Sequence, residues 1–314
     1  MKTRIGILGL GGVGGYFGGL LAREYTKSNT VEIIFIARGE TQKNIVESGL
    51  KILSDDGETI VFPDLVSDNP ELIGTLDYLI CATKTYDIET SFELYRKCIA
   101  PDTIILPLYN GVDATERINK LFPQNIVLQG CVYIVSMIVA PGIIKKIGPY
   151  EKLFFGSKST KDSRITTLQS IFEKAKIESY FVANIEETVW EKFIFISALA
   201  SATSYLNQNI GQILSNSESK QVYISLLNEI ALVASAKGLK MPKNIIEETI
   251  IKLEKSPQEA TSSMHRDFLA NHKTEVVSLT EFVVKEGQKY RVSTPVYQLI
   301  LDKLQNKNRF NFRF

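Results

Sequence analysis

The spacing of apolar residues changes near residue 183 of the sequence. Before it, short apolar runs of strand length alternate with segments of helical period. The clearest strand runs are residues 4–10, 31–37, 76–83 and 102–109, and the predicted helices are residues 16–25, 86–99, 112–121 and 162–176. A strand followed by a helix, repeated along the chain, predicts a doubly wound parallel sheet of the α/β class.

Two other strand patterns in this half do not fit a parallel sheet. Residues 50–53 and 58–62 flank the turn Ser54-Asp55-Asp56-Gly57, which is typical of a β-hairpin. Residues 125–156 are also strand-like, with a turn at Ala140-Pro141-Gly142 between strands at 134–139 and 143–147, and a further strand at 152–156. We therefore expect the hairpin at residues 50–62 to be an insertion outside the parallel sheet.

Beyond residue 183 the strand pattern stops and helical periods take over. The predicted helices are residues 185–206, 218–237, 243–253, 261–270, 275–288 and 295–304. Ser293-Thr294-Pro295 resembles a helix start with proline at the first position. We expect two domains, an α/β domain over residues 1–182 and an all-helical domain over residues 183–314.

Glycine is concentrated where the first strand meets its helix. Eight of the chain's 20 glycines fall in the first 19 residues, and Gly9-Leu10-Gly11-Gly12-Val13-Gly14 fits GxGxxG. In that pattern Gly9 makes the tight turn, Gly11 lets a pyrophosphate approach the backbone, and Gly14 lets the helix pack on the strand. The position after a strand, with a second strand to follow, predicts a dinucleotide-binding Rossmann domain.

The end of the second strand indicates which nicotinamide is bound. An acidic residue there suits the ribose hydroxyls of NAD, whereas an arginine suits the 2′-phosphate of NADP. This sequence has Arg38 at that end, and Glu40 comes only after the turn. Arg38 therefore favours NADP; the alternative is an ordinary solvated arginine.

Two polar residues follow later strands of the predicted sheet. Lys84 ends the strand at 76–83, and Asn110 ends the strand at 102–109. Ligands of doubly wound sheets bind beyond the carboxyl ends of the strands, so both residues are candidates for the same site. The alternatives are a solvent-facing lysine and a turn asparagine before Gly111.

Composition and charge exclude several other classes of protein. Lys and Arg number 36 against 35 Asp and Glu, which provides no basic field for nucleic acid. Cys81, Cys98 and Cys131 are widely spaced and lack a CxxC pair, so we expect neither a disulfide framework nor a metal site. The uncharged stretches 121–144 and 193–217 are interrupted by turn or polar residues. We expect a soluble, cytoplasmic protein that acts on a small molecule.

Reduction of a carbonyl by hydride needs a proton donor for the oxygen. The chain has only His265 and His272, seven residues apart, and we expect both to be partly exposed surface residues. Lys192 is a better candidate because it begins a strongly apolar helix, and partial desolvation lowers the pKa of an ammonium group. The alternative is a lysine that extends its ammonium into solvent.

Six motifs together resemble one family over essentially the whole chain. They are the glycine motif, Lys84, Asn110-Gly111, Trp190-Glu191-Lys192, Ser262-Ser263-Met264 and Lys273-Thr274-Glu275. In this order the sequence resembles ketopantoate reductase (2-dehydropantoate 2-reductase). The resemblance implies a Rossmann domain and a helical domain with the active site between them, in a monomer or homodimer. It also implies reduction of 2-dehydropantoate to pantoate by NADPH, for pantothenate synthesis.

The resemblance also implies a role for each matching residue. Lys192 corresponds to the proton donor, and Glu275 to the acid that orients cofactor and substrate. Asn110 would contact both ligands, Lys84 the cofactor, and Ser263 the substrate carboxylate. Periodicity and spacing alone point to neither Glu275 nor Ser263.

Four positions depart from the pattern of this family, which has asparagine at each. They are Ile196, Ala200, Ile210 and Ala260. Loss of hydrogen-bonding groups weakens selection for a hydroxylated substrate. Ser197, Ser201 and Thr203 are candidates for partial replacement, although the first two are rotated off the face of the lysine at 3.6 residues per turn. The alternatives are therefore a reductase of a less hydroxylated 2-oxo acid and a non-enzymatic NADP-sensing module.

Overall fold

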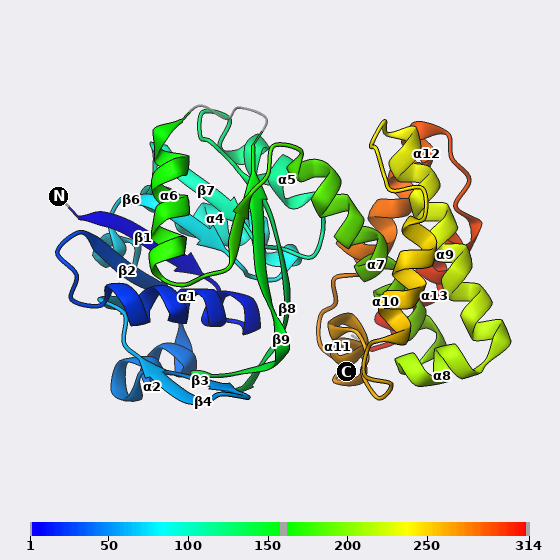
Figure 1. Cartoon of the computed structure of the whole chain (residues 1–314), viewed down its shortest axis with the longest axis horizontal. Helices are drawn as coiled ribbons and strands as arrows, with labels where there is room; N and C mark the ends of the chain where they lie inside the picture. Colours follow the sequence, from blue (N-terminus) through cyan, green and yellow to red (C-terminus); the bar gives the residue numbers. More distant parts are fainter. Residues whose placement is uncertain (1, 158–161, 312–314) are drawn as a thin grey trace. The chain divides into compact units, whose positions relative to one another are not determined.

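The chain forms two compact units, which we describe from a computed structural model covering residues 2–157 and 162–311 (Figure 1). The α/β unit comprises Met1–Tyr109 and Ala114–Ile185. The helical unit comprises Asn110–Asp113 and Glu186–Phe314. A short segment that follows the strands of the α/β unit therefore belongs, by its contacts, to the helical unit.

A five-stranded parallel sheet forms the centre of the α/β unit. Its strands, in sheet order, are β5 (Leu65–Ser67), β2 (Val31–Ile36), β1 (Thr3–Leu8), β6 (Leu76–Cys81) and β7 (Ile99–Pro107). In the register, Gly6 of β1 pairs with Ile34 of β2 and with Leu79 of β6. The predicted doubly wound parallel sheet is confirmed.

Alternate residues of the central strands enter two different cores. Ile5 and Ile7 of β1 are buried in one core with α1 (Gly12–Tyr25). Leu8 is buried in another core, which includes residues of α4 (Ile88–Leu94) and α5 (Ala114–Leu121). Because successive side chains of a strand point to opposite faces, helices cover both sides of the sheet.

A second sheet accounts for the remaining strands of the α/β unit. Its strands are β3 (Leu50–Ser54), β4 (Gly57–Val61), β8 (Gln129–Ala140), β9 (Ile143–Gly156) and β10 (Ser179–Phe181). The predicted hairpin is β3 and β4, outside the parallel sheet as expected. The two strands predicted at 143–147 and 152–156 form one strand, β9, whose register against β8 shifts beyond Ile147. Gly148, at φ 72°, lies in this irregular part.

Helix α1 lies between the two sheets, and its glycines make this packing possible. A Cβ at Gly18 would lie 3.1 Å from Ile7 of the parallel sheet. On other sides of the helix, a Cβ at Gly15 would lie 2.7 Å from Ile144, and one at Gly19 only 2.4 Å from Ile52. These three glycines are outside the GxGxxG motif, so packing between sheets explains part of the glycine concentration.

Some shorter elements of the α/β unit were absent from the prediction or were merged in it. Helices α2 (Gly39–Ser48) and α3 (Pro70–Ile73) were not predicted, because only Ile45 and Ile73 of them are buried and no apolar stripe develops. The helix predicted at 86–99 consists of the 3₁₀ turn η1 (Thr85–Asp87), α4 and the 3₁₀ turn η2 (Arg96–Cys98). Helix α6 (Ser163–Lys174) was predicted and is present.

The described part of the second unit is built from helices, which confirms the predicted all-helical half. These are α7 (Ile185–Leu206), α8 (Ile210–Ser215), α9 (Ser217–Ala236), α10 (Ile245–Glu254), α11 (Ser263–Leu269), the π-helix η3 (Val277–Glu281), α12 (Phe282–Tyr290) and α13 (Pro295–Asn311). The predicted start at Pro295 is confirmed, whereas α8 was missed. The apolar helix α7 is a core element, with Phe193 1% exposed and packed edge-on against Trp190 and Phe282.

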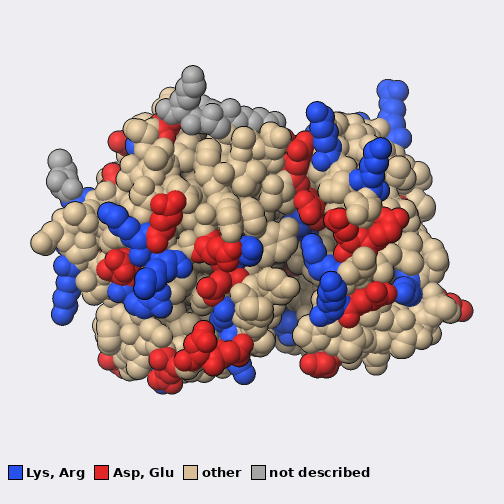
Figure 2. Space-filling model, viewed as in Figure 1, with Lys and Arg blue, Asp and Glu red and all other residues tan. Residues whose placement is uncertain are grey.

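Two observations concern the charged surface and the length of the apolar helices. On the face shown in Figure 2, Lys and Arg side chains are interspersed with Asp and Glu. Within residues 2–157 and 162–311, no helix is long and apolar enough to cross a membrane.

Candidate active site

The glycine turn has the geometry that a pyrophosphate needs. Gly9 has φ 95°, and a Cβ there would lie 2.7 Å from the backbone nitrogen of Thr83. A Cβ on Gly14 would lie only 2.0 Å from the carbonyl oxygen of Gly9, so the helix and the strand approach too closely for any other residue. By contrast, a Cβ on Gly11 meets no described atom within 4 Å. The turn is thus tightly packed on one side and open at Gly11, which fits a bound dinucleotide.

The other residues of the motif take part through their backbone. Leu10 is buried in the core, and Val13 packs against the same core, so neither side chain is directed to a ligand. A Cβ at Gly12 would lie 2.5 Å from the carbonyl oxygen of Ser136 in β8. Gly12 is therefore needed for contact between α1 and β8.

Arg38 lies immediately before α2, at the carboxyl end of β2, and is exposed. Burial raises the pKa of Tyr95, Asp68 adds to this rise, and the positive charge of Arg38 opposes it. The last effect places Arg38 within electrostatic range of Tyr95. An exposed guanidinium at this strand end is accessible to a phosphate.

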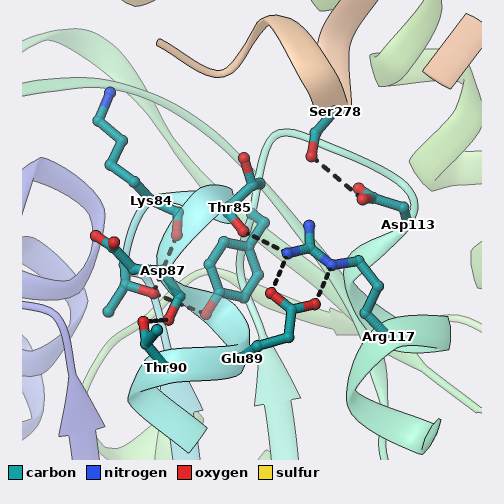
Figure 3. A network of polar contacts seen from close by, with 10 residues as sticks. Lys84, Thr85, Asp87, Glu89, Thr90, Asp113, Arg117 and Ser278 are labelled. Atoms are coloured by element: carbon teal, nitrogen blue, oxygen red, sulfur yellow. Dashed lines mark hydrogen bonds and ion pairs between the residues drawn. The ribbon is translucent and has the colours of Figure 1, made fainter. Parts of the chain in front are cut away.

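Lys84 follows β6 and precedes η1, half-buried, in a turn that touches the glycine turn through Thr83. A network centred on Arg117 of α5 fixes the start of this turn (Figure 3). Arg117 Nη2 donates to the carbonyl oxygen of Thr85 at 2.8 Å. The Lys84 side chain extends away from this network in Figure 3.

Glu89 of α4 holds the Arg117 guanidinium in place. Arg117 Nε donates to Glu89 Oε1 at 2.7 Å and Nη2 donates to Oε2 at 2.6 Å. These hydrogen bonds hold the pKa of Glu89 below its ordinary value. Arg117 was not predicted as a site residue, since no sequence pattern separates such an arginine in an amphipathic helix from a solvated one.

Lys192 and Asn110 are joined directly in the helical unit. Lys192 lies in the third turn of α7 and is 7% exposed, and its Nζ donates to Asn110 Oδ1 at 3.0 Å. Asn110 belongs to the segment Asn110–Asp113, which Ser278 of the π-helix secures by a 3.2 Å hydrogen bond to Asp113 (Figure 3). The ammonium group is therefore buried and fixed by a neutral amide, as a positioned proton donor requires.

The face of α7 that carries Lys192 continues with apolar residues. Ile196 and Ala200 follow at intervals of four residues, and Thr203 lies eleven residues after the lysine, so all four share one face. Ala200 is buried and Ile196 packs partly buried against the helical core. Ile210 and Ala260 lie together, since the Ile210 nitrogen donates to the Ala260 carbonyl at 3.0 Å.

The two serines suggested as replacements for the missing asparagines make hydrogen bonds to the π-helix instead. Ser197 Oγ donates to the carbonyl of Leu279 at 2.6 Å, and Ser201 Oγ lies 2.9 Å from Thr280 Oγ1. Both serines are fully buried and secure α7 to the π-helix. The suggestion that they substitute for ligand-binding asparagines is therefore wrong for these two.

Ser263 is the first residue of α11, and the residues before it are tied to α7. Ser262 caps α11 by accepting from the His265 nitrogen at 3.1 Å, and its Oγ lies 2.8 Å from Thr203 Oγ1. Ser263 itself is half-buried. Thr203 of α7 thus contacts the loop before Ser263 through the Ser262 hydroxyl.

The two histidines differ from the expectation that both are surface residues. His265 is only 5% exposed, and both of its ring nitrogens make hydrogen bonds. His272 is exposed as predicted, but it lies beyond the end of α11 at Leu269, so the two do not share a helix. Polar partners inside the helical unit, which periodicity does not reveal, explain the burial of His265.

Glu275 lies two residues before the π-helix and is 4% exposed, between the buried residues Thr274 and Val276. Its carbonyl oxygen accepts from the Leu279 nitrogen at 3.0 Å. The π-helix was read from sequence as part of a regular helix over 275–288. π-Helices are rare in proteins, and those that occur are often found at functional sites.

The predicted site residues are therefore distributed over both units. The glycine turn, Arg38 and Lys84 belong to the α/β unit, whereas Asn110, Lys192, Ser263 and Glu275 belong to the helical unit. One direct hydrogen bond joins Lys192 and Asn110, and Ser262 links the start of α11 to α7.

Comparison with known families decides the identity of both units. Residues 5–159 match the family described as "Ketopantoate reductase PanE/ApbA", and residues 184–308 match "Ketopantoate reductase PanE/ApbA C terminal". The chain belongs to the ketopantoate reductase family. It is accordingly an oxidoreductase that acts on a small molecule, and reductases of this family use a nicotinamide cofactor.

The proteins similar to this chain include oxidoreductases named for different substrates. The crystal structure of 2-dehydropantoate 2-reductase from Porphyromonas gingivalis W83 is 32% identical, covers 97% of this chain and 100% of its own, and has a TM-score of 0.84. "Uncharacterized oxidoreductase YkpB" of Bacillus subtilis is 28% identical over 95% of this chain and 97% of its own length. D-mandelate dehydrogenase, solved with NADH and anilino(oxo)acetate, has the same fold at 22% identity, with coverage of 98% and 99% and a TM-score of 0.86.

Proposed function

We propose that this member of the ketopantoate reductase family reduces the C2 carbonyl of a small 2-oxo acid with NADPH. The first candidate substrate is 2-dehydropantoate, and its reduction would give pantoate. The reaction would then serve pantothenate synthesis in the cytoplasm. The observation that carries the proposal is the buried Lys192 ammonium, held by Asn110 at 3.0 Å. A fixed ammonium in a partly desolvated position is suited to protonate a developing alkoxide.

The proposed proton transfer uses this hydrogen bond. NADPH, when bound, supplies the hydride that adds to C2. The carbonyl π electrons then become a lone pair on oxygen, and Lys192 Nζ gives its proton to that oxygen. The lysine is left neutral and regains a proton from water. The hydrogen bond to Asn110 keeps Nζ in one orientation. The flexible lysine side chain therefore does not have to rotate into place before it donates the proton.

The α/β unit supplies the residues for the cofactor. The turn from Gly9 to Gly14 would hold the pyrophosphate through its backbone, with the space at Gly11 for close approach. Arg38 would pair with the 2′-phosphate, and Lys84 would stand on the cofactor side at the end of β6. In the helical unit, Ser263 would bind the substrate carboxylate, and Glu275 would orient cofactor and substrate.

The apolar face of α7 favours a second candidate substrate, a less hydroxylated 2-oxo acid. Ile196 and Ala200 follow Lys192 on one face and can offer no side-chain hydrogen bond to a substrate hydroxyl. The neighbouring Ser197 and Ser201 are engaged with the π-helix and so do not replace them. D-mandelate dehydrogenase, which has the same fold, was solved with anilino(oxo)acetate, an oxo acid without an alcohol hydroxyl.

One kinetic comparison separates these possibilities. NADPH oxidation would be followed with 2-dehydropantoate and with 2-oxo acids of matched size that carry no hydroxyl, and kcat/KM would be compared. A higher value for 2-dehydropantoate supports the first candidate, and a higher value for the apolar acids supports the second. NADPH binding without turnover of any 2-oxo acid would instead favour a non-enzymatic NADP-sensing module.

A further inference from the structure

We propose that His265 is a positioning residue for the substrate end of this site. It would fix the loop that precedes Ser263 against the helix that carries Lys192, and so set where the carboxylate of the 2-oxo acid is held. The inference rests on the proposed function. It assigns a role to a residue outside the motifs that suggested the family.

The His265 ring joins two elements that are far apart in the sequence. Nε2 lies 2.9 Å from Asn207 Oδ1, just beyond the end of α7, and Nδ1 lies 2.7 Å from Thr261 Oγ1 in the loop before α11. An amide oxygen accepts, so Nε2 carries a proton, and in the neutral ring Nδ1 accepts from the Thr261 hydroxyl. With 5% exposure, the ring is held by partners inside the helical unit.

Asn207 is suited to the end of α7 from which it contacts the histidine. Its φ of 55° is in the left-handed region, which asparagine tolerates better than most residues. The residue ends the helix and at the same time presents Oδ1 to the ring. The hydrogen bond to Asn207 thus fixes the His265 ring at the C-terminal end of the helix that carries Lys192.

A second connection runs in parallel with the histidine. Thr203, on the lysine face of α7, lies 2.8 Å from Ser262 through their hydroxyl oxygens. Ser262 also accepts from the His265 backbone nitrogen. Thr261 and Ser262, the two residues directly before Ser263, are therefore each held by a side chain, and both connections lead to α7.

This arrangement explains how the loop is fixed where the family asparagine is replaced by Ala260. Ala260 can offer a ligand no side-chain hydrogen bond, and its carbonyl accepts from the Ile210 nitrogen. Hydrogen bonds within the protein, rather than bonds to a ligand, then set the loop. Such a loop is preorganised before the acid binds, and a small displacement of a positioned group costs much of the rate.

Three substitutions of His265 separate the two hydrogen bonds. His265→Phe removes both. His265→Gln places an amide nitrogen near the former Nε2 and can keep the Asn207 contact, whereas His265→Asn reaches only the former Nδ1 and can keep the Thr261 contact. His272→Gln, on an exposed histidine, is the matched control.

The measurements are KM and kcat for the best 2-oxo acid, the Kd of NADPH, and the helical circular dichroism of each variant. We expect His265→Phe to raise KM for the acid by about tenfold or more, as loss of a positioning contact does, with the Kd of NADPH unchanged. At least one of the two amide variants should recover most of the loss, and His272→Gln should match the wild type.

Two results would overturn the inference. One is a folded His265→Phe variant with wild-type KM and kcat. The other is a KM and an NADPH Kd that rise together, with no recovery in either amide variant, which would indicate general loosening of the helical unit. If the wild type binds NADPH but reduces no 2-oxo acid, the proposed function itself fails and this role fails with it.

Discussion

For single residues, chemical type and position in the sequence selected Lys192 and Asn110 as candidates, whereas the predicted exposure of His265 was wrong. Lys192 and Asn110 were singled out separately, and the structure joins them by one hydrogen bond. His265 was expected at the surface and is buried, because Asn207 and Thr261 satisfy its ring nitrogens. Asn207 lies 58 residues from His265 in the sequence, so no local pattern predicts this partner. The roles of Ser263 and Glu275 came from the family resemblance alone.

Arg38 provides the residue-scale prediction, on the choice of cofactor. Its exposed guanidinium at the end of β2 would pair with the 2′-phosphate of NADPH. Arg38→Ala should weaken NADPH binding by about tenfold or more, since a charge-assisted hydrogen bond contributes about 1.5–3 kcal/mol. Binding of NADH, which lacks this phosphate, should change little. Isothermal titration of both cofactors makes the comparison.

The result that contradicts this assignment is equal binding of NADPH and NADH by the wild type. Lys27→Ala is a suitable control, because Lys27 is another cation of the α/β unit and lies at the opposite, amino-terminal side of β2. Its removal should leave both dissociation constants unchanged.

At the scale of elements, the glycines of α1 had two explanations, and the sequence suggested only one. The GxGxxG motif correctly predicted a tight turn at Gly9 and a close approach at Gly14. Gly15 and Gly19 instead face the second sheet, which was visible in the sequence only as a hairpin and an adjoining strand-like region. Helix α2 was missed because it buries only Ile45, and β9 was split because its irregular part contains Gly148.

Two alanine substitutions should separate binding from packing in this turn. Gly14→Ala puts a Cβ 2.0 Å from a backbone oxygen, so we expect a loss of stability of about 1–3 kcal/mol or more, as overpacking causes. Gly11→Ala adds a methyl group in open space and should leave the melting temperature of the cofactor-free protein near that of the wild type. It should nevertheless weaken NADPH binding, because the methyl group occupies the approach to the backbone. Thermal denaturation with and without NADPH measures both effects.

A second element-scale prediction concerns the turn that carries Lys84. Arg117 links η1, α4 and α5 through the Thr85 carbonyl and Glu89. Arg117→Ala removes one of the donors to that carbonyl, which keeps its hydrogen bond from the Ile88 backbone nitrogen, so we expect a cost of about 0.5–1.5 kcal/mol. We expect the turn to relax and the Kd of NADPH to rise by several-fold.

Arg96→Ala is the matched control for Arg117, because Arg96 also pairs with a glutamate of α4 but is exposed. It should leave the Kd of NADPH unchanged. Equal affinities for NADPH in the wild type and in Arg117→Ala would show that this network does not support the cofactor site.

At the scale of the whole molecule, the change of periodicity near residue 183 indicated an α/β part followed by a helical part. The parallel sheet and the helical composition of the second half agree with that reading. The assignment of Asn110–Asp113 to the helical unit depends on tertiary contacts, such as those with Lys192 and Ser278, and could not be predicted. Both units match one family, so the family assignment covers most of the chain.

The central claim is that hydride reaches C2 of a 2-oxo acid while Lys192 donates the proton. The most direct test uses NADPH that carries two deuterium atoms at C4 of the nicotinamide, with mass spectrometry of the hydroxy acid product. We predict one deuterium at C2 with the wild type, and a rate lower by about 10²–10⁴-fold for Lys192→Ala with unchanged NADPH binding. A product without deuterium at C2, or a Lys192→Ala variant with a wild-type rate, would contradict the account.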